Sequence, residues 1–468
     1  GLYRRLDGAW HLTLGLLALG MFASLAKGFD YEEALILAGV ALLLYLSRHA
    51  FYRKSSLLDQ PFSAGWTLML LAILALSAAI GIFAFKNVEY SSELWWQFTY
   101  RSDVSRFLRA SFAAIVVALG FVAIRLLRAA RPEPEPGGAI PGSIRSLVAG
   151  SRRADANLAL TGDKRFLISD DGNAFIMYGV HGHSWVALGD PIGAPAAFHS
   201  LLWRFREMID MHDGSPAFYQ IGPDYQTLYL DMGLSLTKLG EMAHVDLSTF
   251  SLEGSSRKDL RHAMRRAERE QMTFEILPAE QVRRMMPTIR AISDAWLEEK
   301  NAAEKGFSVG FFNEEYIGGC DCAVVARGGK PVAFANLLYG AEKTELSIDL
   351  MRHLGSAPHG TMDFLFGRLM LWGKEKGYRK FGLGMSPLAG LESHPLAPTW
   401  AQVGTIIFRH GEHFYNFEGL RAYKEKFQPE WTPCYLASRG GIALPRVLFD
   451  IAALIGGGIS GVLTRGKR

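Results

Sequence analysis

The sequence predicts a membrane-associated α-helical segment followed by an α/β domain made of two similar lobes. Three observations support this fold class: apolar runs concentrate before residue 130, a Pro/Gly-rich stretch follows them, and short strands then alternate with helices. The chain of 468 residues is longer than one ordinary domain, because domains commonly hold ~100–200 residues. Its net charge of +4 is close to neutral, so binding partners have to be inferred from local charge.

The segment 1–130 is predicted to contain four membrane-spanning helices. A helix needs roughly 20 apolar residues to cross a hydrocarbon core of ~30 Å. Arg48 and His49 interrupt the end of the second apolar stretch, which makes it the weakest of the four. The alternative is a bundle of buried helices in a soluble protein, which the near absence of charge in the last two stretches disfavours. The four stretches are 9–26, 33–51, 65–86 and 107–127.

Basic residues flank these stretches mainly on one side of the expected membrane. An excess of Lys and Arg marks the cytoplasmic side of membrane segments. We therefore expect both ends of the segment, and everything after it, to be cytoplasmic. The flanking residues are Arg4, Arg5, Arg48, Arg53, Lys54, Arg125, Arg128 and Arg131.

The Pro/Gly-rich stretch 131–143 is predicted to be a linker, because Pro removes helical hydrogen bonds and Gly loosens the backbone. Two mixed α/β lobes are expected after it, at 144–250 and 255–437. The apolar tail 442–468 is broken by Pro445 and by three glycines at 456–458. It is therefore expected to lie on the membrane or pack against the helical bundle rather than to form a fifth span.

Asp349 and Arg352 stand at the end of a predicted strand and open the candidate site. The run from Arg352 through Gly355 to Ala357 fits the R/Q-x-x-G-x-G/A loop of Gcn5-related acyltransferases. In that fold the loop joins a strand to a helix, and its free backbone N–H groups hold a pyrophosphate. Two alternatives remain open: Asp349 and Arg352 form a structural ion pair, and the loop glycines, Gly360 among them, serve only the turn.

A second basic cluster, Arg421, Lys424 and Lys426, precedes Pro429. A fixed pair of cations is what a phosphate or a developing oxyanion requires. Neighbouring aromatic side chains, including Tyr415, belong to a core or stack a terminal adenine. The simpler alternative for the cations is a solvated face of a helix.

The stretch 255–270 is predicted to form a strongly basic helix with charged stripes at helical spacing. Its cations suit the phosphates of a nucleic acid or the anionic cytoplasmic leaflet of a membrane. A solubilising surface helix is the alternative. The residues singled out are Arg257, Lys258, Arg261 and Arg265.

Several reaction classes lack their motifs in this sequence. No HExxH, CxxC, P-loop or GxSxG pattern occurs, which disfavours metal-dependent hydrolysis, nucleotide hydrolysis and serine-esterase chemistry. The three cysteines, Cys320, Cys322 and Cys434, are expected to be reduced thiols, and no metal site is predicted. Because the chain begins with Gly, we expect it to be a piece of a longer protein.

Long motifs in the second half resemble a known family. The runs EKGFSVGFF, PHGTMDFLFGRLMLWGKEKGYRKFGLGMSPL and FYNFEGLRAYKEKFQPEW, together with the opening GLYRRL, are similar to bacterial phosphatidylglycerol aminoacyltransferases, the multiple peptide resistance factor family. The resemblance implies tandem Gcn5-like (GNAT) lobes behind membrane helices at the bacterial inner membrane. It also implies transfer of lysine, or alternatively alanine, from aminoacyl-tRNA to phosphatidylglycerol, and resistance to cationic antimicrobial peptides.

The same resemblance implies site residues and partners. The family's essential acidic–basic pair falls on Asp349 and Arg352, and its essential lysine falls on Lys424. Lysyl-tRNA is the expected co-substrate without a further cofactor, and the expected partners are the lipid, an N-terminal flippase part of the longer protein and a second copy of the chain. The implied substrate-binding residues are Arg421, Lys426, Gly355, Gly360 and Tyr415.

Two other functions remain as alternatives. A membrane-anchored acetyl-CoA-dependent N-acetyltransferase would use the same loop, but it leaves the basic helix unexplained. A non-enzymatic membrane scaffold with a degenerate transferase domain would not need the polar residues at 349–352 and 421–426.

Overall fold

The computed structural model describes most of the chain after residue 138 and a short part before it. The described residues are Arg5, 7–28, 31–53, 139–300, 303–392, His394, Leu396, Trp400 and 417–457. Contacts divide the chain into two compact units, one built on residues 1–134 and the other on residues 135–468 apart from 210–213. Each unit is described by itself.

The described part of the first unit contains two helices, α1 (Asp7–Gly28) and α2 (Tyr31–Leu46), followed by the 3-10 turn η2 (Arg48–Ala50). They form where the first two apolar stretches were predicted, and the indole of Trp10 donates a hydrogen bond to the carbonyl of Leu44 at 2.8 Å. In the described ranges, no helix has both the length and the apolar character needed to cross a membrane. The stretches 65–86 and 107–127 and most of the linker lie outside the described residues.

The second unit is built on one twelve-stranded sheet. Its spatial order is β1-β2-β3-β5-β12-β6-β11-β10-β9-β8-β7, with β4 paired to β2. The strands are β1 (Arg165–Ile168), β2 (Ala174–His181), β3 (Ser184–Leu188), β4 (Ile192–Gly193), β5 (Ser215–Ile221), β6 (Ser235–Asp246), β7 (Met272–Leu277), β8 (Cys322–Arg327), β9 (Lys330–Tyr339), β10 (Glu345–His353), β11 (Lys380–Pro387) and β12 (Glu430–Ser438).

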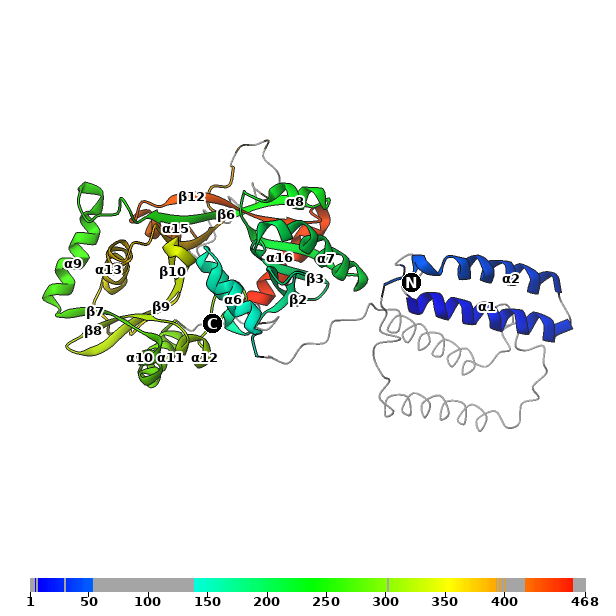
Figure 1. Cartoon of the computed structure of the whole chain (residues 1–468), viewed down its shortest axis with the longest axis horizontal. Coiled ribbons are helices and arrows are strands. Elements are labelled where there is room, and N and C mark those ends of the chain that lie inside the picture. The colour runs from blue at the N-terminus through cyan, green and yellow to red at the C-terminus, as the bar shows by residue number, and fades with distance from the viewer. Residues whose placement is uncertain are drawn as a thin grey trace, which may run out of the picture. The chain divides into compact units, whose positions relative to one another are not determined.

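The two central strands come from distant parts of the chain. Strand β12, near the end of the chain, pairs antiparallel with both β5 and β6. Strand β6 pairs on its other side with β11, also antiparallel. Figure 1 shows β6 and β12 running together between the two groups of strands. The division into lobes at 144–250 and 255–437 stays a prediction, and strands from each predicted lobe pair with strands from the other.

Helices cover both faces of this sheet, and each half of the sheet has a core on each face. In the half made of β1–β5, one core centres on Phe205 and Phe218 under α7, and the other on Phe175 under α6 and α16. In the half made of β7–β11, one core centres on Phe381 and the other on Phe334. Large side chains at alternate strand positions fill these cores, as expected for strands covered on both faces.

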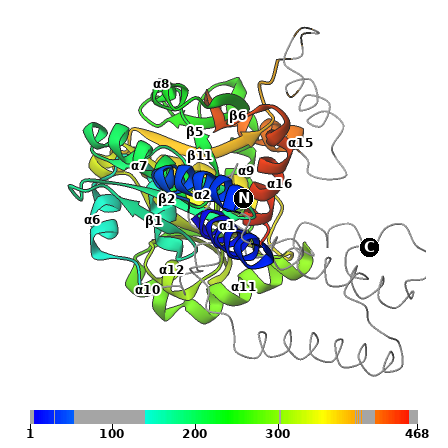
Figure 2. The same ribbon diagram turned by 90° about the vertical axis from the view of Figure 1, so that its right-hand side faces the viewer.

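The covering elements group by face. Figures 1 and 2 show α10, α11 and α12 together beside the sheet half that contains β8 and β9. The helices described in this unit are α6 (Gly142–Gly150), η4 (Ala154–Thr161), η5 (Pro195–Ala197), α7 (Phe198–Met211), α8 (Gln226–Asp231), η6 (Ser255–Arg257), α9 (Lys258–Arg269), α10 (Ala279–Arg284), α11 (Met286–Glu299), α12 (Glu314–Gly318), η7 (Ala341–Lys343), α13 (Thr361–Glu375), α15 (Phe417–Glu425), η9 (Gly441–Ala443) and α16 (Leu444–Ile455).

The apolar tail forms α16 on the sheet. Val447 and Ile451 are buried in the same core as Phe175. The buried carboxylate of Asp450 accepts hydrogen bonds from Ser184 at 2.6 Å and binds the ring of His181 at 2.9 Å. Residues 458–468 lie outside the described part, and membrane association of the tail stays a prediction.

Candidate functional site

A β-bulge in β10 sets the direction of the two predicted catalytic residues on that strand. The pairing of β10 with β9 shifts register between Ile348 and Met351. In a regular strand, residues three apart point to opposite faces, whereas an extra residue restores them to the same face. The bulge therefore lets Asp349 reach α12 and Arg352 reach α11. The buried amide of Asn336 supports the bulge by accepting the N–H of Leu350 at 2.7 Å.

The carboxylate of Asp349 is fixed by two neutral donors. Its Oδ1 accepts the backbone N–H of Gly310 at 2.7 Å, and its Oδ2 accepts the hydroxyl of Tyr316 at 2.8 Å. Burial raises the pKa of Asp349 above its ordinary value, while both hydrogen bonds and the charge of Lys164 act in the opposite direction. The two donors thus fix the orientation of this carboxylate.

Lys164, which precedes β1, is a charged neighbour of Asp349 that could not be identified from the sequence. Its side chain is 0% exposed and pairs with Asp163 at 2.6 Å. It also donates to the hydroxyl of Thr161 at 2.7 Å. Burial lowers the pKa of Lys164, and the charges of Asp163 and Asp349 oppose this shift. The local sequence around Lys164 gives no signal for its proximity to Asp349. That proximity depends on how β10, far along the chain, packs beside the segment before β1.

Arg352 pairs with Glu304 rather than with Asp349. Its two terminal nitrogens donate to the two carboxylate oxygens of Glu304 at 2.8 and 2.6 Å, and one of them also donates to Ser293. The guanidinium lies 5.3 Å from the ring centre of Trp296. Arg352 is only 3% exposed, and its guanidinium is engaged in holding the segment after α11. A phosphate could reach it only by displacing Glu304.

Lys424 on α15 is a buried cation held by carbonyl groups. Its Nζ donates to the backbone oxygens of Gly384 and Met385 at 3.0 and 2.9 Å. Those carbonyls follow a register shift between β11 and β6, where Gly384 has a φ of +74°. Burial lowers the pKa of Lys424 to about 8. Within the described residues no carboxylate pairs with it, so this lysine can hold or release a proton near neutral pH.

The two neighbouring cations each have a carboxylate partner. Arg421 donates to Glu241 at 2.7 Å and stacks over Trp431, and Lys426 contacts Asp363 at 3.2 Å. All three cations of the predicted cluster thus lie on or just after α15, but they differ in their partners. Tyr415 lies outside the described residues.

The predicted phosphate loop joins β10 to α13. Gly360 has a φ of +88° and stands at the N-cap of α13, a conformation that favours glycine. A Cβ at Gly355 would lie 2.3 Å from a carboxylate oxygen of Glu299, an exposed side chain that can move aside, so packing does not require glycine at this position. The amides of Ala357 and Thr361 donate within the loop, to Leu354 and Pro358. Turn geometry explains Gly360 but not Gly355, and a binding role for either glycine stays a prediction.

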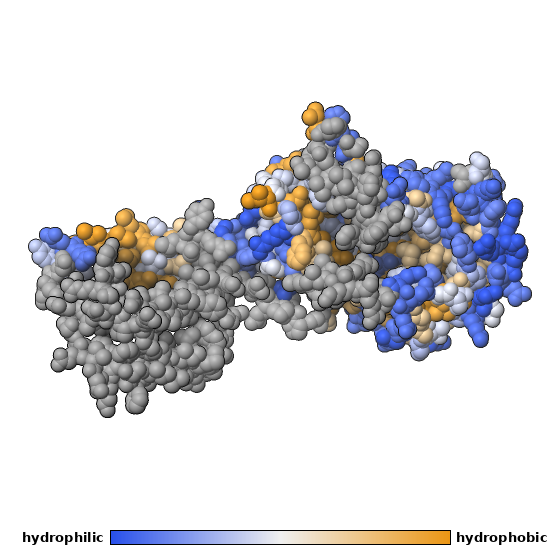
Figure 3. Space-filling model, turned by 180° about the vertical axis from the view of Figure 1, so that it is seen from behind, coloured by the Kyte–Doolittle hydropathy of each residue, from blue (hydrophilic) through white to orange (hydrophobic). Residues whose placement is uncertain are grey.

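The basic helix α9 and the turn η6 before it carry both anchored and exposed cations. Arg257 is buried over Phe250 and donates to the carbonyl of Lys426 at 2.9 Å. Arg261 donates to the carbonyls of Leu252 and Gly254. Lys258 and Arg265 are exposed, as are Arg266 and Arg269. Figure 3 shows the end of the second unit that carries α9 as strongly hydrophilic. Only the exposed set is available to an external polyanion.

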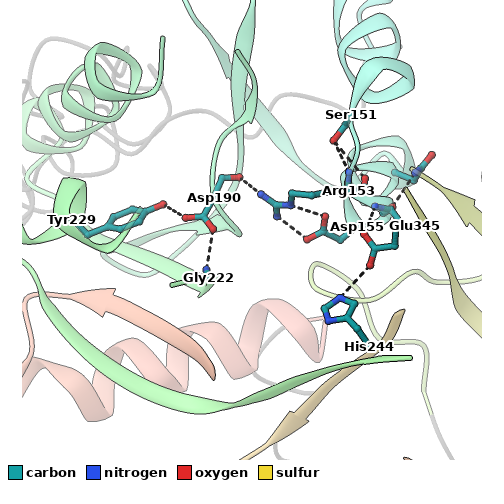
Figure 4. Close-up of polar contacts among 10 residues, drawn as sticks. Ser151, Arg153, Asp155, Asp190, Gly222, Tyr229, His244 and Glu345 are labelled. Carbon is teal, nitrogen blue, oxygen red and sulfur yellow. Dashed lines mark hydrogen bonds and ion pairs between the residues drawn. The ribbon is translucent and has the colours of Figure 1, made fainter. Parts of the chain in front are cut away.

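A polar network links the two halves of the sheet and was not foreseen. Arg153 donates to both oxygens of Asp155 at 3.0 and 2.7 Å and to the carbonyl of Asp190 at 3.2 Å. The carboxylate of Asp190 accepts the N–H of Gly222 and the hydroxyl of Tyr229. Burial raises the pKa of Asp190, against the charge of Arg153. Figure 4 shows these groups as one chain of contacts.

The network continues into the other half of the sheet. Glu345, at the start of β10, accepts the N–H of Ala154 at 2.9 Å and binds the ring of His244 at 3.2 Å. These contacts connect β10 with η4 and with β6. In the described part of the chain, no group of three or more His, Cys, Asp or Glu side chains is arranged to hold a metal.

Most of the α/β domain matches a known protein family. The family profile described as phosphatidylglycerol lysyltransferase, C-terminal, matches residues 145–438. This range covers more than half of the chain. The chain belongs to the phosphatidylglycerol lysyltransferase C-terminal family. The resemblance stated from the sequence motifs is thereby confirmed.

Curated relatives extend the match to the first unit. The chain is 33% identical over 466 residues to a phosphatidylglycerol lysyltransferase of Bacillus subtilis, covering 97% of this chain and 53% of the relative. It is 29% identical over 421 residues to a protein of the same name from Staphylococcus xylosus, covering 90% of this chain and 50% of the relative. The chain therefore spans about half the length of the curated relatives that it matches.

Two solved structures match the α/β domain. A C-terminal domain of a provisionally named lysylphosphatidylglycerol synthetase from Agrobacterium fabrum is 42% identical, with a TM-score of 0.62, and covers 68% of this chain and 97% of that one. The protein named L-PGS from Bacillus licheniformis is 38% identical, with a TM-score of 0.61, and covers 69% and 99%. The α/β part of the predicted fold class is confirmed for this member of the phosphatidylglycerol lysyltransferase C-terminal family.

Proposed function

We propose that this chain transfers lysine from lysyl-tRNA to the glycerol headgroup of phosphatidylglycerol. The observation that carries the proposal is the match over 97% of the chain to a relative named phosphatidylglycerol lysyltransferase. Because the chain covers about half of that relative, the activity of the whole relative is proposed for this chain rather than assigned.

The proposed reaction exchanges one ester for another. A glycerol hydroxyl oxygen attacks the carbonyl carbon of the aminoacyl ester, and a tetrahedral oxyanion forms. The bond from that carbon to the ribose oxygen then breaks, and the proton of the lipid hydroxyl ends on the ribose oxygen. Since the bonds broken and formed are alike, the protein has to supply positioning and charge stabilisation rather than chemical driving force.

The contacts of Asp349 and Lys424 support different roles in this exchange. Asp349 is a fixed acceptor that can orient the attacking hydroxyl or bind the α-ammonium group of the amino acid. Lys424 carries a positive charge with no carboxylate partner in the described residues, so it suits the lipid phosphate or the oxyanion. Arg352 supports the site indirectly, because its guanidinium binds Glu304 and so holds the segment that follows α11.

The exposed face of α9 is the proposed contact for the tRNA phosphates. Lys258 and Arg265 are solvent-exposed, whereas Arg257 and Arg261 are bound to carbonyls of their own unit. Backbone phosphates are recognised by such mobile cations without sequence preference. The same face could meet anionic lipid, and the salt dependence of tRNA binding distinguishes these two uses.

The finer description of the fold is a proposal too. We infer two tandem Gcn5-related lobes, since β10, α13 and β11 form a parallel strand–helix–strand unit with a bulge before the connecting loop. The helical segment is proposed to hold the protein at the inner membrane with the α/β domain on the cytoplasmic side. A flippase part in a longer protein and a homo-oligomer stay predictions.

A reconstituted transfer assay tests the function. The purified chain is mixed with phosphatidylglycerol vesicles and tRNA charged with labelled lysine, and the label is followed into lipid. Transfer from lysyl-tRNA, but not from free lysine with ATP, supports the proposal. An arm with labelled acetyl-CoA and amine acceptors tests the N-acetyltransferase alternative. Absence of lipid labelling with lysyl-tRNA and with alanyl-tRNA would overturn the proposed function and leave the scaffold alternative.

A further inference from the structure

The segment 303–313 places one hydrogen-bond donor, the N–H of Gly310, against Asp349. It is tied at its start by Glu304 to Arg352 and in its middle by the N–H of Phe307, which donates to Asp163 at 2.6 Å. Phe307 is buried with a φ of +60°, which bulky residues rarely adopt. The segment is therefore held in one conformation, and its Gly310 amide meets Asp349 at a fixed place.

Tyr316 lies on the short helix α12 that follows this segment. Asn313 caps the helix, and its side-chain oxygen accepts the N–H of Glu315 at 2.8 Å. Tyr316 is 5% exposed and packs in the core that contains Phe334 and Leu350. Packing therefore fixes the orientation of the Tyr316 ring, and the fixed ring directs its hydroxyl at the carboxylate of Asp349.

The fit around the Asp349 carboxylate is close. A Cβ added at Gly310 would lie 1.8 Å from Oδ2, so the glycine is what allows the carboxylate to approach the segment. Gly310 and Tyr316 each occupy one lone-pair direction, one on each oxygen. A carboxylate has about four such directions, so capacity remains for a substrate group. Two donors on separate oxygens leave the carboxylate plane little freedom to rotate.

We propose that Tyr316 is a positioning residue, which with the Gly310 amide holds the Asp349 carboxylate ionised and oriented for the transferred aminoacyl group or the attacking lipid hydroxyl. The inference rests on the proposed function and deepens it by adding a residue to its site. Tyr316 acts through Asp349 and is not assigned contact with the substrates. The hydroxyl donates to the ionised form of the carboxylate, so it favours that form.

The pH dependence of transfer provides a readout that a purely structural residue would not change. The titratable groups that face Asp349 are Lys164 and Asp163 from the segment before β1, Tyr316 from α12, and Cys320 after it. Lys164 lowers the pKa of Asp349 and Asp163 raises it. Removing the Tyr316 hydroxyl leaves the other three groups, Lys164, Asp163 and Cys320, chemically unchanged. The acidic limb of the kcat profile then reports the ionisation of Asp349.

The experiment compares Tyr316→Phe with Tyr229→Phe in the full chain. Tyr229 is the matched control, because its buried hydroxyl donates to Asp190 at 2.8 Å in the polar network of the other half of the sheet. Both variants lose one hydroxyl–carboxylate hydrogen bond. For Tyr316→Phe, we expect kcat to fall roughly tenfold or more with a small change in KM. Its acidic limb should move up by about one pH unit or more. Tyr229→Phe should leave both unchanged.

The outcomes separate the inference from the function beneath it. If the wild type transfers lysine and Tyr316→Phe matches Tyr229→Phe in kcat and in its acidic limb, the inference is overturned while the proposed function stands. If the wild type transfers nothing, the proposed function itself is overturned. Should Tyr316→Phe lose its near-UV circular dichroism, Gly310→Ala decides instead. Displacement of the carboxylate should again lower kcat, and wild-type kinetics would overturn the inference.

Discussion

At the scale of single residues, the site combines groups whose burial costs free energy. Lys424 illustrates this cost, because it is 6% exposed and its charge is met by carbonyl dipoles alone in the described residues. A buried ammonium without a counter-ion favours its neutral form. Such a group destabilises the fold. Its proposed role, the stabilisation of a phosphate or an oxyanion, explains why this cost is present at the site.

Replacing Lys424 with Met should separate activity from stability. The folded pKa of about 8 lies below the unfolded value, which is roughly 10.4, so the unfolded state binds the proton more tightly between these values. Wild-type stability should therefore rise with pH across that window, by roughly 3 kcal/mol at most. The Met variant should lack this rise, unfold no more easily at pH 7, and lose transfer activity. Urea titrations at pH 7 and pH 10 measure the difference; equal pH slopes in both proteins would contradict it.

Replacing Arg352 with Lys should show that its fork matters as well as its charge. Lysine keeps the charge but cannot donate to both oxygens of Glu304 together with Ser293. We expect a loss of roughly 2 kcal/mol in the free energy of unfolding, since Glu304 is partly exposed and water offsets some of the change. Activity should also fall, because the 303–313 segment loses its anchor.

The matched control for this substitution is Arg153→Lys. Arg153 also binds a carboxylate with two nitrogens, but it lies in the network around Asp190. Its substitution should leave kcat close to the wild-type value. Denaturant titration and the transfer assay measure both effects. A wild-type kcat in Arg352→Lys would remove Arg352 from any role in orienting the site.

At the scale of elements, the sequence identified which strands and helices carry the site but not how they are joined. Asp349, Arg352 and Lys424 could be named because they stand in long motifs that resemble a known family, although Asp349 lies in the middle of β10 rather than at a strand end. The bulge in β10 could not be predicted, because it depends on the pairing with Asn336 of β9. The partner of Arg352 lies 48 residues away in the sequence, in a segment with no regular structure. Long-range partners follow from packing and not from local pattern.

Charge reversal on α9 tests which of its cations face tRNA. Lys258 and Arg265 are exposed, so changing both to Glu should weaken tRNA binding roughly tenfold without unfolding the helix. The slope of log K against log salt should fall by roughly 0.7–0.9 for each phosphate that the variant no longer neutralises. Arg284→Glu on α10 is the control, because that side chain is also exposed and already pairs with Glu280. Filter binding at several salt concentrations measures the slopes. Unchanged slopes with reduced binding to anionic vesicles would assign the face to lipid.

At the scale of the whole α/β domain, the continuous sheet distinguishes this fold from two lobes placed side by side. Strand β6 comes from the predicted first lobe and pairs with β11, while β12 comes from the predicted second lobe and pairs with β5. The local sequence pattern shows where a chain alternates between strands and helices, but it does not determine which strands pair with each other. Because β6 and β12 each pair on both sides, each half of the sheet contains a strand that the other half needs for its hydrogen bonds.

This arrangement predicts one cooperative unfolding transition for residues 139–457. Removing β6 would leave β11 and β12 each with an unpaired edge, and exposed strand edges favour aggregation. The fragment 255–437 expressed alone should therefore fail to fold. Mixing a fragment of residues 255–457, which keeps α16, with a fragment ending at residue 250 should restore native circular dichroism, since β6 would supply the missing pairing. Calorimetry and gel filtration measure both effects. Two separate transitions in the intact domain, or a folded monomeric 255–437 fragment, would show that each half is stable by itself and that the strand pairing only links them.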